Sequence, residues 1–193
     1  MQIPVSLFSM PSGETLTLRS THPDDAASLL CHQQITSGET DFMARYPEEC
    51  TGTLAAMQER LHLLEQHLCS FTVTAFCGDR VVGDLMVTPV RPHIKYLHRA
   101  QLGMAIQRDY WGAGLGRRML TLAIGQARKN GFEQLELGVF CDNTRAIHLY
   151  ESCGFHAWGT QPRAFKLKDG TYRDEIMMIQ FLNEAPCKRE GHT

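Results

Sequence analysis

The chain has 193 residues, of which 43% are hydrophobic and 21% are charged, and its formal net charge at pH 7 is −2. These ordinary values predict a globular protein with a single domain over residues 1–185 and a disordered polar tail at 186–193. The small net charge argues against a nucleic-acid-binding protein, and no apolar run approaches the roughly 20 residues that cross a bilayer.

Seven cysteines are scattered along the chain, at positions 31, 50, 69, 77, 141, 153 and 187. Their odd number and the absence of any Cys-x-x-Cys pair argue against a disulfide framework and against zinc, so no metal site is expected. A reducing, cytoplasmic setting fits this cysteine usage. The N-terminus lacks the basic segment and apolar run of a signal peptide, in agreement with that expectation.

Hydrophobic periodicity and turn residues divide the chain into strands and helices. The first 13 residues predict an irregular lead-in, and residues 36–52 predict a loop or a loose short helix. In chain order, the patterns predict strands at 14–19, 70–77, 80–88, 98–107, 135–140, 155–159 and 176–182, and helices at 20–34, 53–68, 115–129 and 144–152. Residues 162–172 are expected to form turns. This order predicts a mixed α/β domain.

The most informative stretch begins at Met104. A short apolar run leads into the turn Trp-Gly-Ala-Gly-Leu-Gly at 111–116, and an amphipathic helix follows and ends at Gly131. The first N–H groups of a helix have no partner within it, so a helix N-terminus with few side chains is an anion site. Arg117 and Arg118 add positive charge. The stretch therefore predicts a phosphate site, although a tight turn without a ligand fits the same glycines.

Two other glycine-rich nucleotide motifs do not match this turn. A Walker A loop requires Gly-Lys-Ser/Thr, but Gly116 is followed by Arg117 and Arg118. The dinucleotide fingerprint requires Gly-x-Gly-x-x-Gly, whereas the spacing here is Gly-x-Gly-x-Gly. Glu133 and Glu136 lie where that fingerprint places an acidic residue, but they do not restore the glycine spacing.

Residues 143–155 form a second informative stretch. Asn143 and Tyr150 are seven residues apart, so they share one face of the predicted helix, two turns from each other. Both side chains are then able to face the space between this helix and the glycine-turn helix. A simple helix cap at Asn143 and an ordinary core residue at Tyr150 fit the same pattern.

Together, the two stretches resemble the GNAT superfamily of N-acetyltransferases. The family signature joins an apolar strand, a Gln/Arg-x-x-Gly-x-Gly/Ala turn and a helix to a later Asn-x-x-Ala-x-x-x-Tyr-x-x-x-Gly-Phe segment. Residues 111–116 and 143–155 match these parts, with Trp111 where the family usually has Gln or Arg. The resemblance implies the GNAT-like acyl-CoA N-acyltransferase fold, a mixed α/β fold whose mostly antiparallel central sheet is flanked by helices.

The resemblance also implies acetyl-CoA as the co-substrate and suggests which residues bind it. The strand at Met104, Ala105 and Ile106 is implied to offer backbone groups to the pantetheine arm, and Asn143 to contact that arm or an ordered water. Tyr150 is the implied catalytic residue, which protonates the leaving thiolate. The residues implied at the pyrophosphate are Gly112, Ala113, Gly114, Leu115, Gly116 and Arg117.

Acetyl transfer to an amine also needs a base, because alkyl amines have a pKa of about 10 and are protonated at pH 7. Many members of the family place Glu or Asp on the central strand, where this sequence has Gln101. Asp84 and His98 are the candidates, and deprotonation through water is equally open. A solvated strand residue at Asp84 and a structural histidine at His98 are the ordinary interpretations.

We therefore expect an acetyl-CoA-dependent N-acetyltransferase that acts on a primary amine of a small molecule, such as an amino acid or a polyamine. The alternatives are N-terminal acetylation of a protein, for example a ribosomal protein, and a non-catalytic acyl-CoA-binding module. Substrate choice is expected in the loops at 34–46 and 162–172. Glu39, Asp41 and Asp174 would receive a cationic amine or remain solvated charges. By resemblance, a homodimer is expected, without nucleic-acid or membrane partners.

Overall fold

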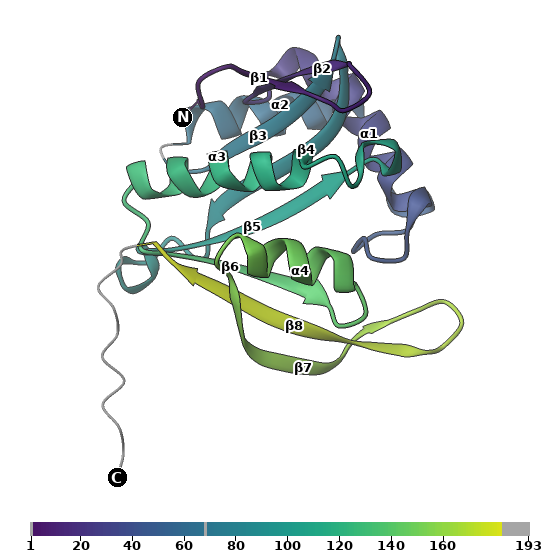
Figure 1. Cartoon of the computed structure of the whole chain (residues 1–193), viewed down its shortest axis with the longest axis vertical. Helices are drawn as coiled ribbons and strands as arrows, with labels where there is room; N and C mark the ends of the chain where they lie inside the picture. The colour runs from purple at the N-terminus through teal and green to yellow at the C-terminus, as the bar shows by residue number, and fades with distance from the viewer. Residues whose placement is uncertain (1, 68, 183–193) are drawn as a thin grey trace.

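The computed structural model describes residues 2–67 and 69–182, and the tail predicted at 186–193 lies outside them. The strands are β1 (Ser6–Ser9), β2 (Thr15–Arg19), β3 (Phe71–Cys77), β4 (Arg80–Pro89), β5 (Arg99–Ile106), β6 (Gln134–Phe140), β7 (His156–Lys166) and β8 (Tyr172–Phe181). The α-helices are α1 (Ala26–Glu39), α2 (Leu54–Gln66), α3 (Leu115–Lys129) and α4 (Thr144–Ser152). Figure 1 shows α3 and α4 across one face of the sheet and α1 and α2 across the other.

The described strands form one eight-stranded sheet in the order β1-β2-β3-β4-β5-β6-β8-β7. Within it, β5 and β6 are the one parallel pair, and every other neighbouring pair is antiparallel. The predicted fold class, a mixed α/β domain with a mostly antiparallel sheet, is confirmed.

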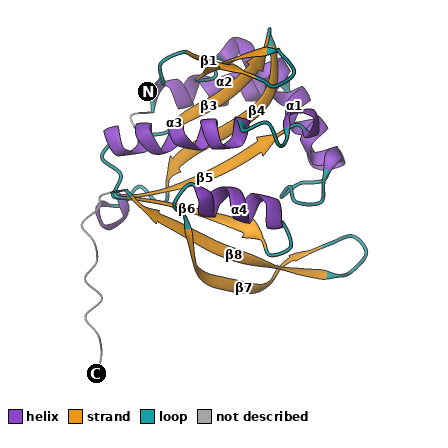
Figure 2. Ribbon diagram, in the orientation of Figure 1, coloured by secondary structure: helices purple, strands orange, loops and turns teal. Residues whose placement is uncertain are grey.

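The parallel pair is short. Residues 99–101 of β5 pair with residues 134–136 of β6, and within the described sheet the two strands do not pair with each other beyond these residues. Figure 2 shows the two strands leaving a common edge and separating toward α4. At the paired end, Glu136 accepts hydrogen bonds from Arg99 and from the Gln134 side chain. The bonds from Arg99 to Glu136 join β5 to β6 at their paired end, before the two strands separate.

Helix α3 is held against the sheet by apolar residues at helical spacing. Leu115, Met119 and Ala123 are fully buried in the main core with Leu85 of β4. Burying a side chain of this size contributes roughly 1.5–3 kcal/mol each. Because the packing starts at Leu115, the first turn of α3 is fixed beside the end of β5, where the glycine turn joins the two elements.

Three strands differ from the sequence prediction, and one of them is β8, which begins at Tyr172, four residues before the strand predicted at 176–182. The lead-in contains β1, which has no alternating pattern of its own and exists because it pairs with β2 at the edge of the sheet. β7 continues through the predicted turn segment to Lys166, past Pro162. Proline lacks a ladder donor, but β7 is an edge strand whose register shifts between Gln161 and Phe165, so Pro162 is tolerated there.

Helix α1 also runs further than predicted, to Glu39, so the loop expected from residue 36 starts at Thr40. Gly38 falls in the last turn of the helix, where its low helix propensity has little effect. Residues 2–67 and 69–182 include no helix with the length and apolar character that a membrane crossing requires.

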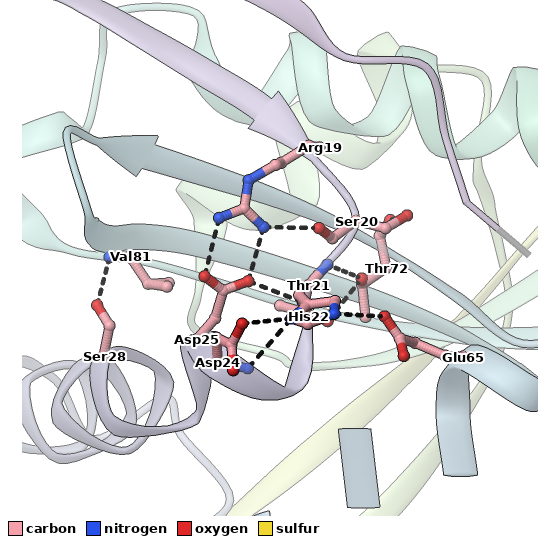
Figure 3. A network of polar contacts seen from close by, with 10 residues as sticks. All are labelled: Arg19, Ser20, Thr21, His22, Asp24, Asp25, Ser28, Glu65, Thr72 and Val81. Carbon is pink, nitrogen blue, oxygen red and sulfur yellow. Dashed lines mark hydrogen bonds and ion pairs between the residues drawn. The ribbon is translucent and has the colours of Figure 1, made fainter. Parts of the chain in front are cut away.

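A polar network fixes the start of α1 to the sheet (Figure 3). The two terminal guanidinium nitrogens of Arg19, Nη1 and Nη2, donate to the Asp25 carboxylate at 2.6 and 2.8 Å, and the backbone N–H of His22 donates to it at 2.7 Å. Arg19 also lies over the Phe76 ring. Burial alone would raise the pKa of Asp25, but the hydrogen bonds from Arg19 and His22 outweigh it and hold the pKa below its usual value.

Candidate active site

A cleft of about 540 Å³ opens where β5 and β6 separate. Its walls come from the second half of β5, the glycine turn, the first turn of α3, β6, α4 and the loop after α1. Phe165 of β7 and Glu175 of β8 complete it. The cleft thus lies where β5 and β6 are no longer paired, and carbonyl and N–H groups of β5 are available there to a ligand.

The structure brings most of the predicted site residues together in this cleft. Among the described residues that line it are these ten from the sequence prediction: Met104, Ala105, Ile106, Gly112, Gly114, Leu115, Gly116, Arg117, Asn143 and Tyr150. Ala113 lies in the same turn but does not line the cleft. Two motifs that are separated by the whole of α3 and β6 in sequence therefore face one space.

The glycine turn has the backbone geometry that its sequence suggests. Gly112 and Gly114 have φ values of 73° and 85°, in the left-handed region that side chains avoid, and Gly114 caps α3 without a side chain. A methyl group on Gly116 would lie 2.9 Å from Leu149 Cδ2 of α4. The turn therefore lets α4 approach closely and leaves the unpaired N–H groups of α3 open toward the cleft.

Trp111, the departure from the family pattern, has a structural role in the turn. Its indole Nε1–H donates to the Ile106 carbonyl oxygen at 2.6 Å, which ties the turn to the end of β5. The Arg145 guanidinium stacks over the indole ring at 3.3 Å from its centroid. Burial, and then the charge of Arg108, lowers the pKa of Arg145. Arg145 thus adds a second cation, beside Arg117, to the described lining of the cleft.

Tyr150 lies at the floor of the cleft, 7% exposed, with its ring edge-to-face against Phe155. Burial raises the pKa of Tyr150 to about 12, so the hydroxyl stays protonated at neutral pH. No described residue forms a hydrogen bond with that hydroxyl. A protonated, unpartnered donor that faces a cleft is suited to give a proton to a bound group.

Asn143 has the structural role that its position suggested, and it also lines the cleft. Its side-chain oxygen accepts a hydrogen bond from the Ala146 N–H at 3.2 Å, which caps α4. The cap leaves the amide N–H₂ group as a donor toward the cleft. The two interpretations of Asn143 are therefore compatible.

Neither candidate base lines the cleft among the described residues. His98 precedes β5 at the paired end, and its carbonyl oxygen accepts hydrogen bonds from the N–H groups of Glu133 and Gln134. Asp84 accepts a hydrogen bond at 3.0 Å from Nε2 of His32, a completely buried residue of α1. Asp84 thus joins β4 to α1 and is not simply a solvated strand residue, whereas His98 accepts its bonds through the backbone carbonyl.

The acidic residues proposed to receive an amine are also placed away from the cleft walls. Glu39 accepts a hydrogen bond from the Arg108 N–H at 2.9 Å, and Asp174 accepts one from the Arg163 N–H at 2.8 Å. The second bond supports Arg163 in its left-handed conformation, with φ 53°. Asp41 lines a smaller neighbouring pocket.

Sequence reasoning missed the carboxylate that does line the cleft, Glu175, and the aromatic residues beside it. Phe140 stacks on Phe165 at 3.8 Å between ring centroids, and Phe42 meets Phe140 edge-to-face at 5.8 Å. Phe42 comes from the loop after α1, within the segment expected to set substrate choice. No signal in the sequence around Glu175 distinguishes it from a solvated strand residue, because its neighbours in space are far away in sequence.

The sequence comparison identifies the family. Residues 19–155 match the model of the acetyltransferase (GNAT) family, and the chain belongs to this family. Among solved structures, the acetyltransferase of GNAT family from Streptococcus pneumoniae superposes with a TM-score of 0.82 at 29% identity, over 86% of this chain and 99% of that one. A putative acetyltransferase, yncA from Salmonella typhimurium with its cofactor acetyl-CoA, superposes with a TM-score of 0.77 over 88% and 95%. At 20% identity, the yncA likeness concerns the fold alone.

Curated relatives differ in the acceptors that their names state. L-amino acid N-acyltransferase MnaT of Escherichia coli is 29% identical over 46% of this chain and 51% of its own length. Mycothiol acetyltransferase of Renibacterium salmoninarum is 27% identical over 81% and 44%. The [ribosomal protein bS18]-alanine N-acetyltransferase of Escherichia coli is 37% identical over 39% and 50%. The chain spans about half the length of these relatives.

Proposed function

We propose that this chain is an acetyl-CoA-dependent N-acetyltransferase whose acceptor is a primary amine of a small molecule. The observation that carries the proposal is one cleft that joins the α3 N-terminus, the unpaired edge of β5 and the protonated hydroxyl of Tyr150. An anion site, an extended backbone edge and a proton donor are what a thioester with a phosphorylated tail requires.

In this mechanism, the N–H groups of the glycine turn and the guanidinium groups of Arg117 and Arg145 bind the pyrophosphate of the co-substrate. The backbone of residues 104–106 hydrogen-bonds the pantetheine arm. A backbone N–H of the same strand stabilises the oxyanion that forms when the amine attacks the thioester carbonyl. Tyr150 then gives its proton to the sulfur as the carbon–sulfur bond breaks.

Two observations support a small acceptor over a protein N-terminus. The cleft of about 540 Å³ is of the size that holds small molecules, and it must also accommodate the acyl end of the co-substrate. Beside the backbone of β5, the bulky aromatic side chains of Phe42 and Phe165 line the cleft. Protein N-terminal acetylation remains the second candidate, because relatives of both kinds match this chain.

The test is the shift in unfolding temperature that acetyl-CoA produces in the purified chain, followed by acetyl transfer to a panel of amines. A ligand that binds only the folded state stabilises it by about 2.7 kcal/mol at a hundredfold excess over its Kd. We expect a shift with acetyl-CoA and thiol release that depends on the amine. ATP is the control for general phosphate binding. Binding without transfer to any amine or peptide would contradict the enzyme and leave the acyl-CoA-binding module.

A further inference from the structure

Glu175 occupies the point where the two parallel strands begin to separate. It lies on β8 opposite Phe140 of β6, and its carboxylate lies directly over Gly138. A side chain at position 138 would collide with that carboxylate, so the glycine creates the space for it. Gly103 on β5 and Gly138 on β6 each stand two residues beyond the last parallel pair, Gln101 and Glu136. The cleft is therefore open at this level, with a carboxylate at its edge.

The Glu175 carboxylate has no hydrogen bond or ion pair within the described part of the chain, although the residue is only partly exposed. It is the sole carboxylate among the described residues that line the cleft. The cleft cations, Arg117 and Arg145, belong to α3 and α4, and the nearby Arg173 of β8 is paired with Asp142. A carboxylate that no cation of the described chain pairs with is suited to a cationic ligand.

An apolar wall stands next to this carboxylate. Phe140, Phe165 and Phe42 form one contiguous aromatic cluster, and all three line the same cleft. The lining of the cleft thus includes cations from α3 and α4 and, from the sheet and the loop after α1, a carboxylate with aromatic rings. The cations and the helix N–H groups match the phosphates of the co-substrate, and the carboxylate with the aromatic rings matches an ammonium group attached to an apolar body.

We propose that Glu175 binds the substrate ammonium and removes its proton, and that the phenylalanine cluster selects primary amines with an apolar body and no carboxylate beside the amine. This inference rests on the proposed acetyltransferase function. A free amino acid is disfavoured, because its carboxylate would lie close to the Glu175 carboxylate and the two would repel each other.

The proton and electron balance of the step is complete. The ammonium gives one proton to the Glu175 carboxylate, and the neutral nitrogen forms a bond to the thioester carbon. The nitrogen loses its second proton to solvent as the tetrahedral intermediate collapses and the carbon–sulfur bond breaks. The thiolate takes the Tyr150 proton. Glu175 releases its proton to solvent and Tyr150 regains one, which leaves an amide, a thiol and one net proton.

The first test compares Glu175→Gln with wild type, using 2-phenylethylamine and acetyl-CoA. Loss of a general base typically lowers the rate by 10²–10⁴-fold, and we expect a decrease in kcat/KM of about a hundredfold or more at pH 7. The deficit should shrink as pH approaches the amine pKa of about 10, because the amine then arrives neutral. A structural role for Glu175 would lower the rate equally at all pH values.

Two further variants test whether the position of the Glu175 carboxylate matters as well as its charge. Gly138→Ala retains the carboxylate but displaces it from its site, so it should reproduce the defect of Glu175→Gln with the same pH dependence. Glu59→Gln, an exposed glutamate of α2, is the matched control and should behave as wild type. All variants should keep the thermal shift with acetyl-CoA, which shows that the fold and the co-substrate site are intact.

The second test is acceptor choice. In wild type, 2-phenylethylamine should exceed both ethylamine and phenylalanine by at least tenfold in kcat/KM. The inference would be overturned if kcat/KM of Glu175→Gln stayed within twofold of wild type at every pH, or if phenylalanine were a better acceptor than 2-phenylethylamine. Either result would leave the acetyltransferase activity itself in place. Wild type that transfers acetyl to no amine would instead refute the proposed function, so the two failures are distinguishable.

Discussion

At the residue scale, Tyr150 shows how burial prepares a proton donor. An ordinary tyrosine has a pKa near 10, and burial raises that of Tyr150 to about 12. A thiol like that of coenzyme A has a pKa near 8.5, so proton transfer from Tyr150 to the thiolate is uphill at equilibrium. In the mechanism that we propose, the Tyr150 hydroxyl therefore hydrogen-bonds the sulfur as charge develops on it, and the proton transfer is completed when Tyr150 regains a proton from solvent.

Tyr150→Phe should lower kcat by about 10²-fold, because the hydrogen bond to the leaving sulfur is lost. The thermal shift with acetyl-CoA should not change, since the ring and its contact with Phe155 remain. Because Tyr150 stays protonated well above neutral pH, the ratio of wild-type to variant rates should be constant from pH 7 to 10. Tyr172→Phe, an exposed tyrosine of β8, is the control. An unchanged kcat in Tyr150→Phe would remove Tyr150 from the mechanism.

At the element scale, the anion site that we propose at the junction of β5 and α3 rests on backbone geometry. The left-handed conformations of Gly112 and Gly114 turn the chain, and Leu115 anchors the helix in the core. Trp111 closes the junction by its hydrogen bond to Ile106. The site therefore depends on conformation more than on side-chain chemistry, which explains how the turn keeps its geometry with tryptophan where the family usually has Gln or Arg.

Gly114→Ala should lower the free energy of unfolding by roughly 1–2 kcal/mol, because a side chain disfavours the φ of 85°. It should also weaken acetyl-CoA binding, measured by calorimetry. Gly125→Ala, in the same helix and with open space around it, should instead raise the unfolding free energy by roughly 0.5–1 kcal/mol. Urea denaturation measures both. Equal effects of the two substitutions would contradict a special role for the turn.

At the scale of the whole molecule, the sheet holds the fold together and also contributes strands to the walls of the cleft. Antiparallel pairing joins the strands β1 to β5 in one half of the sheet and β6, β8 and β7 in the other. The short parallel pair of β5 and β6 joins the two halves, and the ion pair of Arg99 and Glu136 stabilises it. Burial alone would raise the pKa of Glu136, but the hydrogen bonds from Arg99 and Gln134 outweigh it and lower the pKa. Asp25 is held in the same way by Arg19 at the start of α1. Two carboxylates thus stabilise the fold in their ionised form.

Since the folded-state pKa values of Glu136 and Asp25 lie below their ordinary values of 4.5 and 3.8, their contribution is complete above those values. It is lost as pH falls through the lowered folded-state values. Glu136→Gln should therefore lower the free energy of unfolding by roughly 1–3 kcal/mol at pH 7, and by less at pH 3. Exposed Glu133→Gln is the control. A difference that does not depend on pH would contradict this account.

The sequence alone determined the features that lie within one contiguous stretch. The glycine turn, the helix it opens and the spacing of Asn143 and Tyr150 are local, because dihedral preferences and helical periodicity act over a few residues. They were sufficient to predict the family, the fold class and ten residues that line the cleft.

Only the tertiary structure decided which groups meet in the cleft. β8 brings Glu175 onto Gly138, 37 residues earlier in the chain, and the loop after α1 brings Phe42 against Phe140. Asp84 and His98 looked equally suitable in sequence, but sheet register directs them to His32 and to the paired end of β5. Strand register and crossover connections determine these contacts, and they depend on pairing across the whole sheet, which no local pattern encodes.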